Sequence, residues 1–588
     1  MSQGGLIKDM RKMLVVDMGE QEVREEKLPE KFRKKGGRGL TSEMVLDRVN
    51  PEAHPLGKNN KLVFAPGMVT GTSAPSSGRI SVGGKSPLTG GIKESNAGTP
   101  FAQSLGRSGY RAIIVEGKPE DEEGSWLLEI TSEGAELKRA DELKELETSE
   151  TVDKLLETYD DHDFCLVGPA GEWKMSMAGI CFNDPEYRAS RYSGRGGLGA
   201  VMGSKGLKAI ALEKRISDVE LADEDLFRQG QRKLAEGLRE HDVTKPGGTL
   251  NSYGTAALIN VLDQAGGLPT ENFKSGTFSG AENTSGEKLA ETVEGRGGEG
   301  EMGHSCHPGC VIQCSNVYPD EDGEELVSCV EYESDWSLGA NLGIDDLDKI
   351  AEMIKICNEV GVDTIEAGVT LGVAMEAGLA EFGDGDAALE LMDEIRENTS
   401  LGRILGNGAE FTGKAYGVTR IPTVKGQGMP AYEPRAVKGI GITYMTTPMG
   451  ADHTAGYTIA PEILSVGGEV DPLDPEDKAE LSRAFQATTA FVDSSGYCLF
   501  TTFAMLDDES AMEGMVDTVN GVLGTDYTVD EIVEEGKEIL KKEREFNFKA
   551  GFSKHDDRPP EFMREESLPP HNDKFDVPDE ELDKVWDF

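Results

Sequence analysis

Short apolar runs bounded by turn residues recur through the first third of the chain, and this pattern predicts β-strands. The runs lie at residues 62–65, 112–116, 126–130 and 209–212. The segment 71–98 is rich in Gly, Ser, Thr and Pro, and such a segment forms loops whose amides can approach an anion. We therefore expect the first 212 residues to be mostly β structure with many turns.

Apolar residues recur at helical spacing after residue 213. Asp345 and Asp346 can cap a helix whose apolar positions continue as far as Cys357. After Gly361, Asp363 can begin a second helix of the same kind. We interpret Cys357 as a core position of the first helix, because a buried cysteine behaves as a small hydrophobe.

Three cysteines stand four residues apart in the segment 304–316, and a fourth lies far downstream. They are Cys306, Cys310, Cys314 and Cys498. One short loop-to-helix segment could aim the first three thiolates at one point. Three clustered thiolates plus a remote one are a common pattern for a [4Fe–4S] cluster, because each iron takes one Cys ligand.

Two other interpretations of these cysteines stay open. Zinc could use the same thiolates together with His304 or His307. The cysteines could also be inert core residues. The spacing does not match the Cys-x3-Cys-x2-Cys pattern of radical-generating enzymes, so that class is disfavoured.

The composition limits the class of partner. The chain has 588 residues, which is too long for one core, so several domains are expected. Lys and Arg total 60 against 108 Asp and Glu, a formal charge of −48. This charge argues against nucleic acid as a partner. The acidic side chains also repel one another unless salt screens their charges. This repulsion predicts a halophilic protein, and an ordinary acidic protein is the alternative.

The chain shows no feature of membrane insertion or export. Residues 1–30 are charged and lack the apolar stretch of a signal peptide. No run of about 18 apolar residues is present, so no membrane partner is expected. Eight cysteines in 588 residues are too few for a disulfide scaffold and fit a reducing compartment. We therefore expect a cytoplasmic protein.

Motifs spread over nearly the whole chain resemble those of the aldehyde ferredoxin oxidoreductase family, the tungsten–pterin enzymes. They lie at residues 36–40, 77–79, 85–90, 95–98, 109–117, 194–205, 331–333, 361–364 and 493–498. Each motif alone is a weak signal, but together they are specific.

The resemblance implies an α+β fold of three domains. Residues 1–212 would form an N-terminal β-sheet domain that is the base of the pterin site. Residues 213–420 and 421–588 would form two mainly α-helical domains that close over it. The second would carry the three clustered cysteines, and the third would carry Cys498.

The resemblance also implies the cofactors. Two pterin dithiolenes would hold one tungsten or molybdenum without a protein ligand to the metal, and Mg²⁺ would bridge the pterin phosphates. Positions that match the phosphate and magnesium sites are Arg79, Asn96, Gly98, Arg191 and Tyr192, with the backbone carbonyls of Asn96 and Tyr192 serving the magnesium. The four cysteines match the [4Fe–4S] ligands, although the first spacing is one residue longer than in the best-known members.

Five further positions match the pterin-binding motifs and the pocket beside the metal. Asp363 and Asp493 belong to two D-x-x-G-x-[CD] motifs, and the first motif opens with Asn358 in place of Asp. An amide accepts a hydrogen bond but brings no charge. Glu333 and His453 match the pocket residues, where a carboxylate or imidazole can move a proton.

The implied reaction is oxidation of an aldehyde to a carboxylic acid, with electrons passing through the [4Fe–4S] cluster to ferredoxin. The pterin centre would supply the redox chemistry and the cluster the route out. The resemblance is also compatible with a homodimer. One alternative is the catalytic subunit of a larger tungsten-dependent acid or aromatic acyl reductase complex. Another is a non-enzymatic iron–sulfur or zinc protein.

Overall fold

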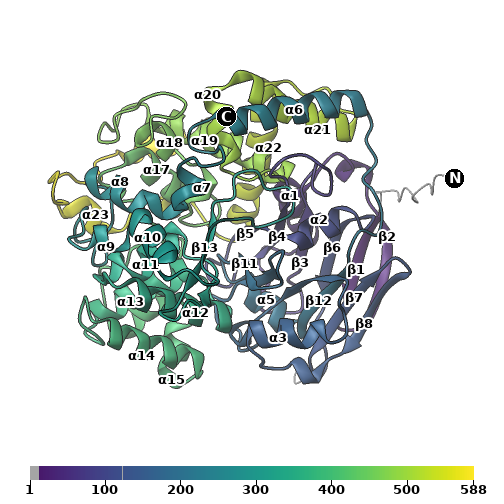
Figure 1. Cartoon of the computed structure of the whole chain (residues 1–588), viewed down its shortest axis with the longest axis horizontal. Helices are drawn as coiled ribbons and strands as arrows, with labels where there is room; N and C mark the ends of the chain where they lie inside the picture. Colours follow the sequence, from purple (N-terminus) through teal and green to yellow (C-terminus); the bar gives the residue numbers. More distant parts are fainter. Residues whose placement is uncertain (1–11, 122–123) are drawn as a thin grey trace.

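The computed structural model describes residues 12–121 and 124–588 and places a β domain beside a larger helical body (Figure 1). The β domain contains two six-stranded sheets, with orders β2-β1-β6-β3-β4-β5 and β11-β10-β9-β12-β7-β8. The first sheet comprises β1 (Lys12–Asp17), β2 (Glu22–Lys27), β3 (Leu62–Pro66), β4 (Arg79–Lys85), β5 (Ile92–Gly98) and β6 (Tyr110–Glu116). The second comprises β7 (Trp126–Thr131), β8 (Gly134–Arg139), β9 (His162–Leu166), β10 (Ile180–Asn183), β11 (Ala189–Ser193) and β12 (Leu207–Glu213).

The four strands predicted from apolar runs are confirmed as β3, β6, β7 and β12. Successive side chains of β6 point to opposite faces of the sheet, and both faces are buried, so a continuous apolar run forms a strand here. Ile113 and Val115 belong to the core shared by the two sheets. Ala112 and Ile114 lie in a separate core on the other face of the first sheet. The helices of this domain are α1 (Gly37–Arg48), α2 (Pro100–Gly106), α3 (Thr148–Leu156), α4 (Pro169–Glu172) and α5 (Leu198–Ser204).

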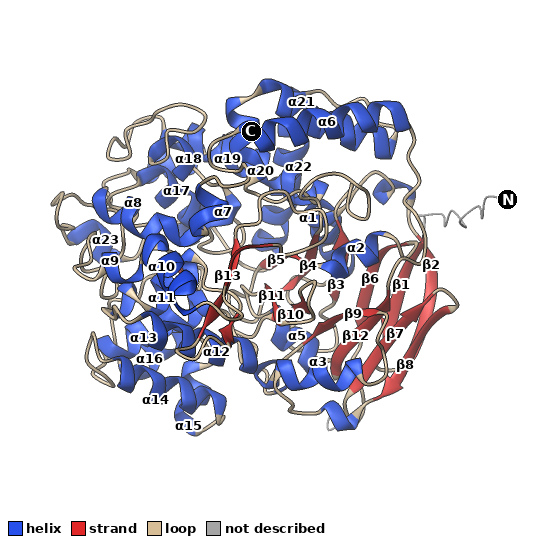
Figure 2. Cartoon of the chain, viewed as in Figure 1, coloured by secondary structure: helices blue, strands red, loops and turns tan. Residues whose placement is uncertain are grey.

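Strands β5 and β11 are edge strands of the two sheets and adjoin each other on the side that faces the helical body (Figure 2). The Ser193 hydroxyl donates to the Ser95 carbonyl at 3.3 Å across this junction. An edge strand leaves some backbone groups without a partner strand. Backbone polar groups at this junction are therefore available to bind a ligand between the β domain and the helices.

Helices dominate the rest of the chain. Those before residue 420 are α6 (Glu224–Glu240), α7 (Thr249–Tyr253), α8 (Leu258–Gln264), α9 (Ala281–Thr284), α10 (Gly286–Arg296), α11 (Tyr332–Leu338), α12 (Leu347–Val360), α13 (Thr364–Glu376), α14 (Gly385–Arg396), α15 (Ser400–Leu405) and α16 (Ala409–Tyr416). Those after it are α17 (Lys438–Thr446), α18 (Ile459–Glu462), α19 (Lys478–Ser495), α20 (Thr501–Asp507), α21 (Glu509–Leu523), α22 (Val529–Lys549), α23 (Glu561–Glu565) and α24 (Asp579–Lys584). Helix α6 packs along α21, far away in the sequence (Figure 1).

The predicted helix starts are confirmed. The Asp346 side chain accepts from two backbone amides of the first turn of α12. The Asp363 side chain does the same at the start of α13. Cys357 is fully buried on α12, as expected for a core position.

The expectation of a loop-to-helix segment for the clustered cysteines is wrong. They lie in a loop between β13 (Glu301–His304) and β14 (Ser315–Pro319), which pair with each other in a sheet completed by β15 (Glu325–Val327). Pro308 cannot donate a backbone hydrogen bond, and Gly309 has a positive φ of 91°, so a helix cannot form here. A small sheet thus interrupts a region expected to be mainly helical.

Within the described part of the chain, none of the helices is both long and apolar enough to cross a membrane.

Candidate functional site

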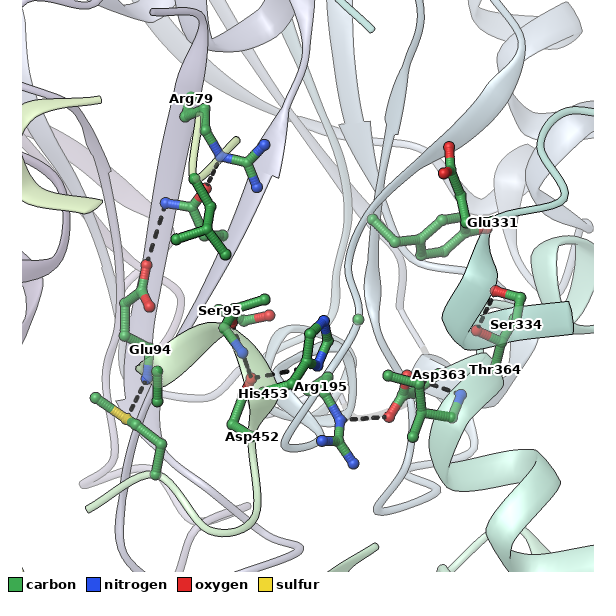
Figure 3. Close-up of a pocket in the computed structure, with 18 of the residues that line it drawn as sticks. Arg79, Glu94, Ser95, Arg195, Glu331, Ser334, Asp363, Thr364, Asp452 and His453 are labelled. Carbon is green, nitrogen blue, oxygen red and sulfur yellow. Dashed lines mark hydrogen bonds and ion pairs between the residues drawn. The ribbon is translucent and has the colours of Figure 1, made fainter. Parts of the chain in front are cut away.

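A cavity opens where the two edge strands face the helical body (Figure 3). It encloses about 1180 Å³ of empty space, its opening to solvent included. Among the predicted site residues, those that line it are Arg79, Asn96, Tyr192, Asn358, Asp363, His453 and Asp493. The structure thus brings together side chains from residue 79 to residue 493.

The two predicted pterin-binding motifs form matching turns, and residues of both line this cavity. In each, a helix ends at a left-handed glycine: α12 at Gly361 (φ 82°) and α19 at Gly496 (φ 95°). Each turn also docks on the β domain through backbone hydrogen bonds. The Gly179 amide donates to the Gly361 carbonyl at 3.0 Å, and the Val69 amide donates to the Ser495 carbonyl at 2.9 Å.

Both turns approach the β domain closely enough to require glycine there. A Cβ on Gly168 would lie 2.3 Å from the Val360 carbonyl oxygen. A Cβ on Gly67 would lie 2.1 Å from the Gly496 Cα. The glycine-rich sequence of the β domain therefore serves close backbone packing against the motif turns.

One arginine from the β domain contacts each motif aspartate. Arg195 Nε lies 3.2 Å from Asp363 Oδ2 (Figure 3). Arg38 Nη1 lies 3.4 Å from Asp493 Oδ2. Burial, reinforced by the neighbouring Glu94, raises the pKa of Asp493 to about 7. The Asp493 carboxyl can therefore act either as a hydrogen-bond donor or as an acceptor near neutral pH.

Asn358 occupies the first motif with its amide already oriented. Its Nδ2 donates to the Ser328 carbonyl at 3.2 Å, so its Oδ1 remains as the acceptor at the cavity wall. An aspartate here would face that carbonyl with a second oxygen, which explains why an amide suits this position. The Tyr192 hydroxyl donates to the Asn358 carbonyl at 2.5 Å, which joins β11 to the end of α12.

The predicted phosphate-binding arginines differ in how fully they are paired. Arg79 Nε donates to Asn96 Oδ1. Arg191 is buried, and its Nη1 lies 3.7 Å from Cys329 Sγ, while its Nε and Nη2 have no partner among the described residues. Unpartnered buried guanidinium donors are costly and point to an absent acceptor. Arg191 is not a lining residue itself, but Cys329 beside it lines the cavity.

Gly98 lies between the cavity and the cysteines. A Cβ at this position would stand 2.9 Å from Cys306 Sγ and 3.3 Å from Arg79 Nη1. Arg79 Nη1 and Cys306 Sγ thus lie close to the same point at Gly98, and Arg79 also lines the cavity. A charged side chain bridges the two places where cofactors are expected.

The remote Cys498 is tied to the cysteine loop through Ser76. The Cys498 amide donates to the Ser76 carbonyl at 2.9 Å, and the Ser76 amide donates to the Gly309 carbonyl at 2.9 Å. Thiol atoms of Cys306 and Cys310 lie within 4.8 Å of each other, together with a ring nitrogen of His307.

The two histidines proposed as zinc ligands have other partners. His307 Nε2 accepts from the Gly78 amide at 3.2 Å, and its Nδ1 lies 2.9 Å from the Pro308 carbonyl oxygen. His304 Nε2 lies 3.2 Å from Asp184 Oδ2. These partners compete with a metal for both rings, although a ring nitrogen of His307 still lies within 4.8 Å of the Cys306 and Cys310 thiols.

Glu333 and His453 form a largely buried pair, 15% and 14% exposed, with Glu333 Oε1 3.4 Å from His453 Nε2. Glu333 Oε2 accepts from the Ala431 amide at 3.1 Å. His453 Nδ1 has no hydrogen-bond partner, and the ring lines the cavity (Figure 3). Glu333 lies behind His453 rather than on the cavity wall.

Burial shifts both members of this pair toward their neutral forms. It raises the pKa of Glu333 to about 8 and lowers the pKa of His453 to about 4. At 3.4 Å Glu333 Oε1 makes no hydrogen bond within the described chain. A closer approach of a protonated Glu333 would let it donate to His453 Nε2, which leaves Nδ1 as an N–H donor. The pair can therefore polarise a carbonyl oxygen without carrying a net charge.

Sequence reasoning missed Arg38, Arg195 and Asp452. Asp452 also lines the cavity and pairs with Lys93 at 3.0 Å. The sequence did contain a signal for the two arginines, because each is flanked by glycines, in Gly37-Arg38-Gly39 and in Gly194-Arg195-Gly196. A charged side chain between glycines marks a backbone that approaches another segment closely.

Comparison with known proteins identifies the family. The family model "Aldehyde ferredoxin oxidoreductase, N-terminal domain" matches residues 13–214, and the model for domains 2 and 3 of the same family matches residues 229–587. The tungsten-containing aldehyde ferredoxin oxidoreductase of Pyrococcus horikoshii is 38% identical over 579 residues, covering 94% of this chain and 91% of that protein. The Thermococcus kodakarensis protein of the same description is 36% identical over 580 residues, with coverage of 94% and 91%.

Two more distant similarities extend the comparison. The WOR-like subunit of an aliphatic sulfonate oxidoreductase from Pyrococcus furiosus is 26% identical over 626 residues, covering 97% of this chain and 92% of that protein. The solved active-site complex BamBC of benzoyl coenzyme A reductase superposes with a TM-score of 0.78 at 18% identity, covering 98% of this chain and 94% of the other. That likeness supports the α+β fold. By its sequence matches over nearly its whole length, this chain belongs to the aldehyde ferredoxin oxidoreductase family, a family of oxidoreductases.

Proposed function

We propose that this chain oxidises an aldehyde to a carboxylic acid at a tungsten–bis(pterin) centre and passes the electrons through a [4Fe–4S] cluster to ferredoxin. The observation that carries the proposal is the buried Glu333–His453 pair, whose histidine lines a cavity that residues of both pterin motifs also line. Relatives described as tungsten-containing aldehyde ferredoxin oxidoreductases, 36–38% identical to this chain, support it.

The residues around the cavity fit a phosphate-bearing pterin. The unpartnered Nε and Nη2 of Arg191 suit a phosphate, because guanidinium donors match its oxygens in pairs. Asn358 Oδ1 and the Asp493 carboxyl suit the amino and ring N–H groups of a pterin. For Mg²⁺, the candidate donors are the backbone carbonyls of Asn96 and Tyr192, which lie on the adjoining edge strands β5 and β11.

The overall reaction is RCHO + H2O → RCOOH + 2H⁺ + 2e⁻. When bound, the tungsten–pterin group supplies the two-electron redox chemistry. The chain's own part is to hold the aldehyde and move protons. His453 Nδ1–H can donate to the carbonyl oxygen of the aldehyde while Glu333 donates to Nε2.

The same pair can also accept a proton once Glu333 is ionised. A proton taken up at His453 Nδ1 is matched by transfer of the Nε2 proton to the Glu333 carboxylate. Asp452 lies 4.0 Å from Nδ1 and is held as a carboxylate, because Lys93 and Arg195 overcome the effect of burial and keep its pKa below its usual range. It would stabilise the imidazolium during this transfer.

Cys306, Cys310, Cys314 and Cys498 are the proposed cluster ligands. Support comes from the Ser76 backbone bonds that join Cys498 to the cysteine loop, and from the engagement of His304 and His307 elsewhere. Arg79 stands between this site and the cavity, so it is the side chain best placed to couple the two centres.

The deciding experiment measures metals and turnover on one preparation. We expect tungsten near one per chain, about four irons, and reduction of a viologen dye that depends on added aldehyde. Protein with both metals but without aldehyde-dependent dye reduction would refute the proposed reaction. Co-purification of further subunits would instead favour the alternative of a larger reductase complex, and the non-enzymatic alternative is already disfavoured by the family.

A further inference from the structure

Three of the segments around the four cysteines carry no acidic residue, although about one residue in five of this chain is acidic. Residues 243–262, 302–319 and 494–506 contain neither Asp nor Glu. Burial explains only part of this lack of acidic residues, because some residues of the three segments are exposed. Besides Val261 on α8, these exposed residues are Pro246, Gly247, Thr249, Tyr253, Pro308 and Gly309, and we call these six the acid-free face.

Helix α7 holds one half of this face against the cysteine loop. Asn251 Nδ2 donates to the Gln313 carbonyl at 3.4 Å. A Cβ on Gly254 would lie 3.1 Å from the Cys314 carbonyl oxygen. Figure 2 shows α7 beside β13, the strand that leads into the loop. Tyr253, 39% exposed, thus projects from a helix that touches the cysteine loop directly.

The other half of the face is the cysteine loop itself. The exposed Pro308 and Gly309 directly precede Cys310. A protein that rests on them comes within a few bonds of a proposed cluster ligand. Acidic residues resume at the ends of these segments, at Asp242 and Glu301 beside the face, and Asp242 is paired with Lys245. Helix α10, which contacts α7, carries the exposed Glu287, Glu291 and Glu294.

We infer that the acid-free face is the docking surface for a small acidic iron–sulfur carrier protein, with Tyr253 as its anchor. The inference rests on the proposed function. Elsewhere a formal charge of −48 repels an acidic partner, so encounter is least hindered where the acids are absent. An exposed aromatic side chain is also the type that anchors protein interfaces.

The chemistry favours a small and transient contact. Each aldehyde releases two electrons, and one-electron carriers must therefore dock, be reduced and leave twice per turnover. Electron-transfer encounters of this kind bury little surface, below about 1,200 Å². A compact uncharged patch suits fast release better than a large apolar interface does.

The test compares Tyr253→Glu with Tyr416→Glu. Tyr416 is a matched control, since it is another exposed tyrosine (41%) and lies at the end of α16. For Tyr253→Glu we expect kcat/KM for a purified acidic ferredoxin to fall about tenfold or more at low ionic strength and to recover partly with salt. Benzyl viologen reduction with the same aldehyde should be unchanged in both variants, and Tyr416→Glu should reduce ferredoxin normally.

Equal ferredoxin rates in the two variants would overturn the inference, and so would a wild-type protein that reduces the dye but not ferredoxin. Sedimentation adds a separate outcome. If Tyr253→Glu converts a dimer to a monomer without slowing ferredoxin reduction, the face binds a second copy of the chain and the inference is wrong. Loss of dye reduction in the wild type would refute the proposed function instead, so the two failures are distinguishable.

Discussion

Arg195 Nε lies 3.2 Å from Asp363 Oδ2, so a β-domain side chain holds the aspartate that begins α13. Arg195 also donates to the carbonyls of Ala451 at 2.7 Å and Gly428 at 2.6 Å. One buried guanidinium therefore joins the β domain to two separate parts of the helical body at the edge of the cavity. The five N–H donors of the guanidinium allow these contacts, whereas a lysine ammonium would not reach all of these partners at once.

Replacing Arg195 should destabilise the protein strongly. Arg195→Met leaves the Asp363 carboxylate without its buried partner, a loss of about 3–5 kcal/mol in comparable cases. Arg228→Met is the matched control, because Arg228 is 64% exposed and pairs only with Glu224 on α6. We expect a marked fall in melting temperature for the first variant and little change for the second. Equal melting temperatures would show that the Arg195 contacts are not important for stability.

Removing the Glu333 carboxyl should stop catalysis without removing the cofactors. Glu333→Gln keeps the size and the acceptor for the Ala431 amide but cannot exchange a proton with His453. We expect aldehyde-dependent dye reduction to fall about 10²-fold or more, with tungsten and iron unchanged. Glu462→Gln is the control, because Glu462 is also buried with one unpartnered oxygen but binds Lys478 instead. Wild-type turnover in a metal-replete Glu333→Gln protein would contradict the proposed role.

Turnover should rise with pH as Glu333 ionises. Burial raises the pKa of this carboxyl to about 8, so below that pH it is protonated and cannot accept the proton that His453 hands on. If proton uptake limits the rate, kcat should increase between about pH 6.5 and 8.5 and then level off. The same profile recorded for Glu333→Gln serves as the comparison. An identical rise in that variant would assign the titration to another group.

Replacing Cys498 should lower the iron content of the protein. Cys498→Ala leaves one iron of a four-iron cluster without a ligand, although Cys498 lies far beyond Cys314 in the chain. We expect lower iron content and an altered low-temperature spectrum of the reduced protein. Cys357→Ala should keep its iron, because Cys357 is buried on α12. Full iron in the Cys498 variant would mean that this thiol is not a ligand.

Salt should stabilise the fold if the chain is halophilic. With a formal charge of −48, self-repulsion falls as the Debye length drops to about 3 Å at 1 M salt. We expect the melting temperature to rise from low salt to molar KCl, and to rise less in sorbitol of the same osmolality. A flat response to KCl would favour an ordinary acidic protein.

The sequence by itself determined the local structure, because that depends on neighbours in the chain. The apolar runs predicted β3, β6, β7 and β12, and the two caps at Asp346 and Asp363 predicted helix starts. The distributed motifs also identified the family, and seven of the site residues that they named line one cavity.

Only the tertiary structure decided which distant residues meet. Arg195 and Arg38 look like loop residues in the sequence, and their role appears once the motif turns dock on the β domain. The cysteine loop was expected to run into a helix, but pairing of β13 with β14 fixed it as a loop. The neutral state of Glu333 and His453 likewise has no signature in the sequence, because burial by segments far along the chain sets their pKa values.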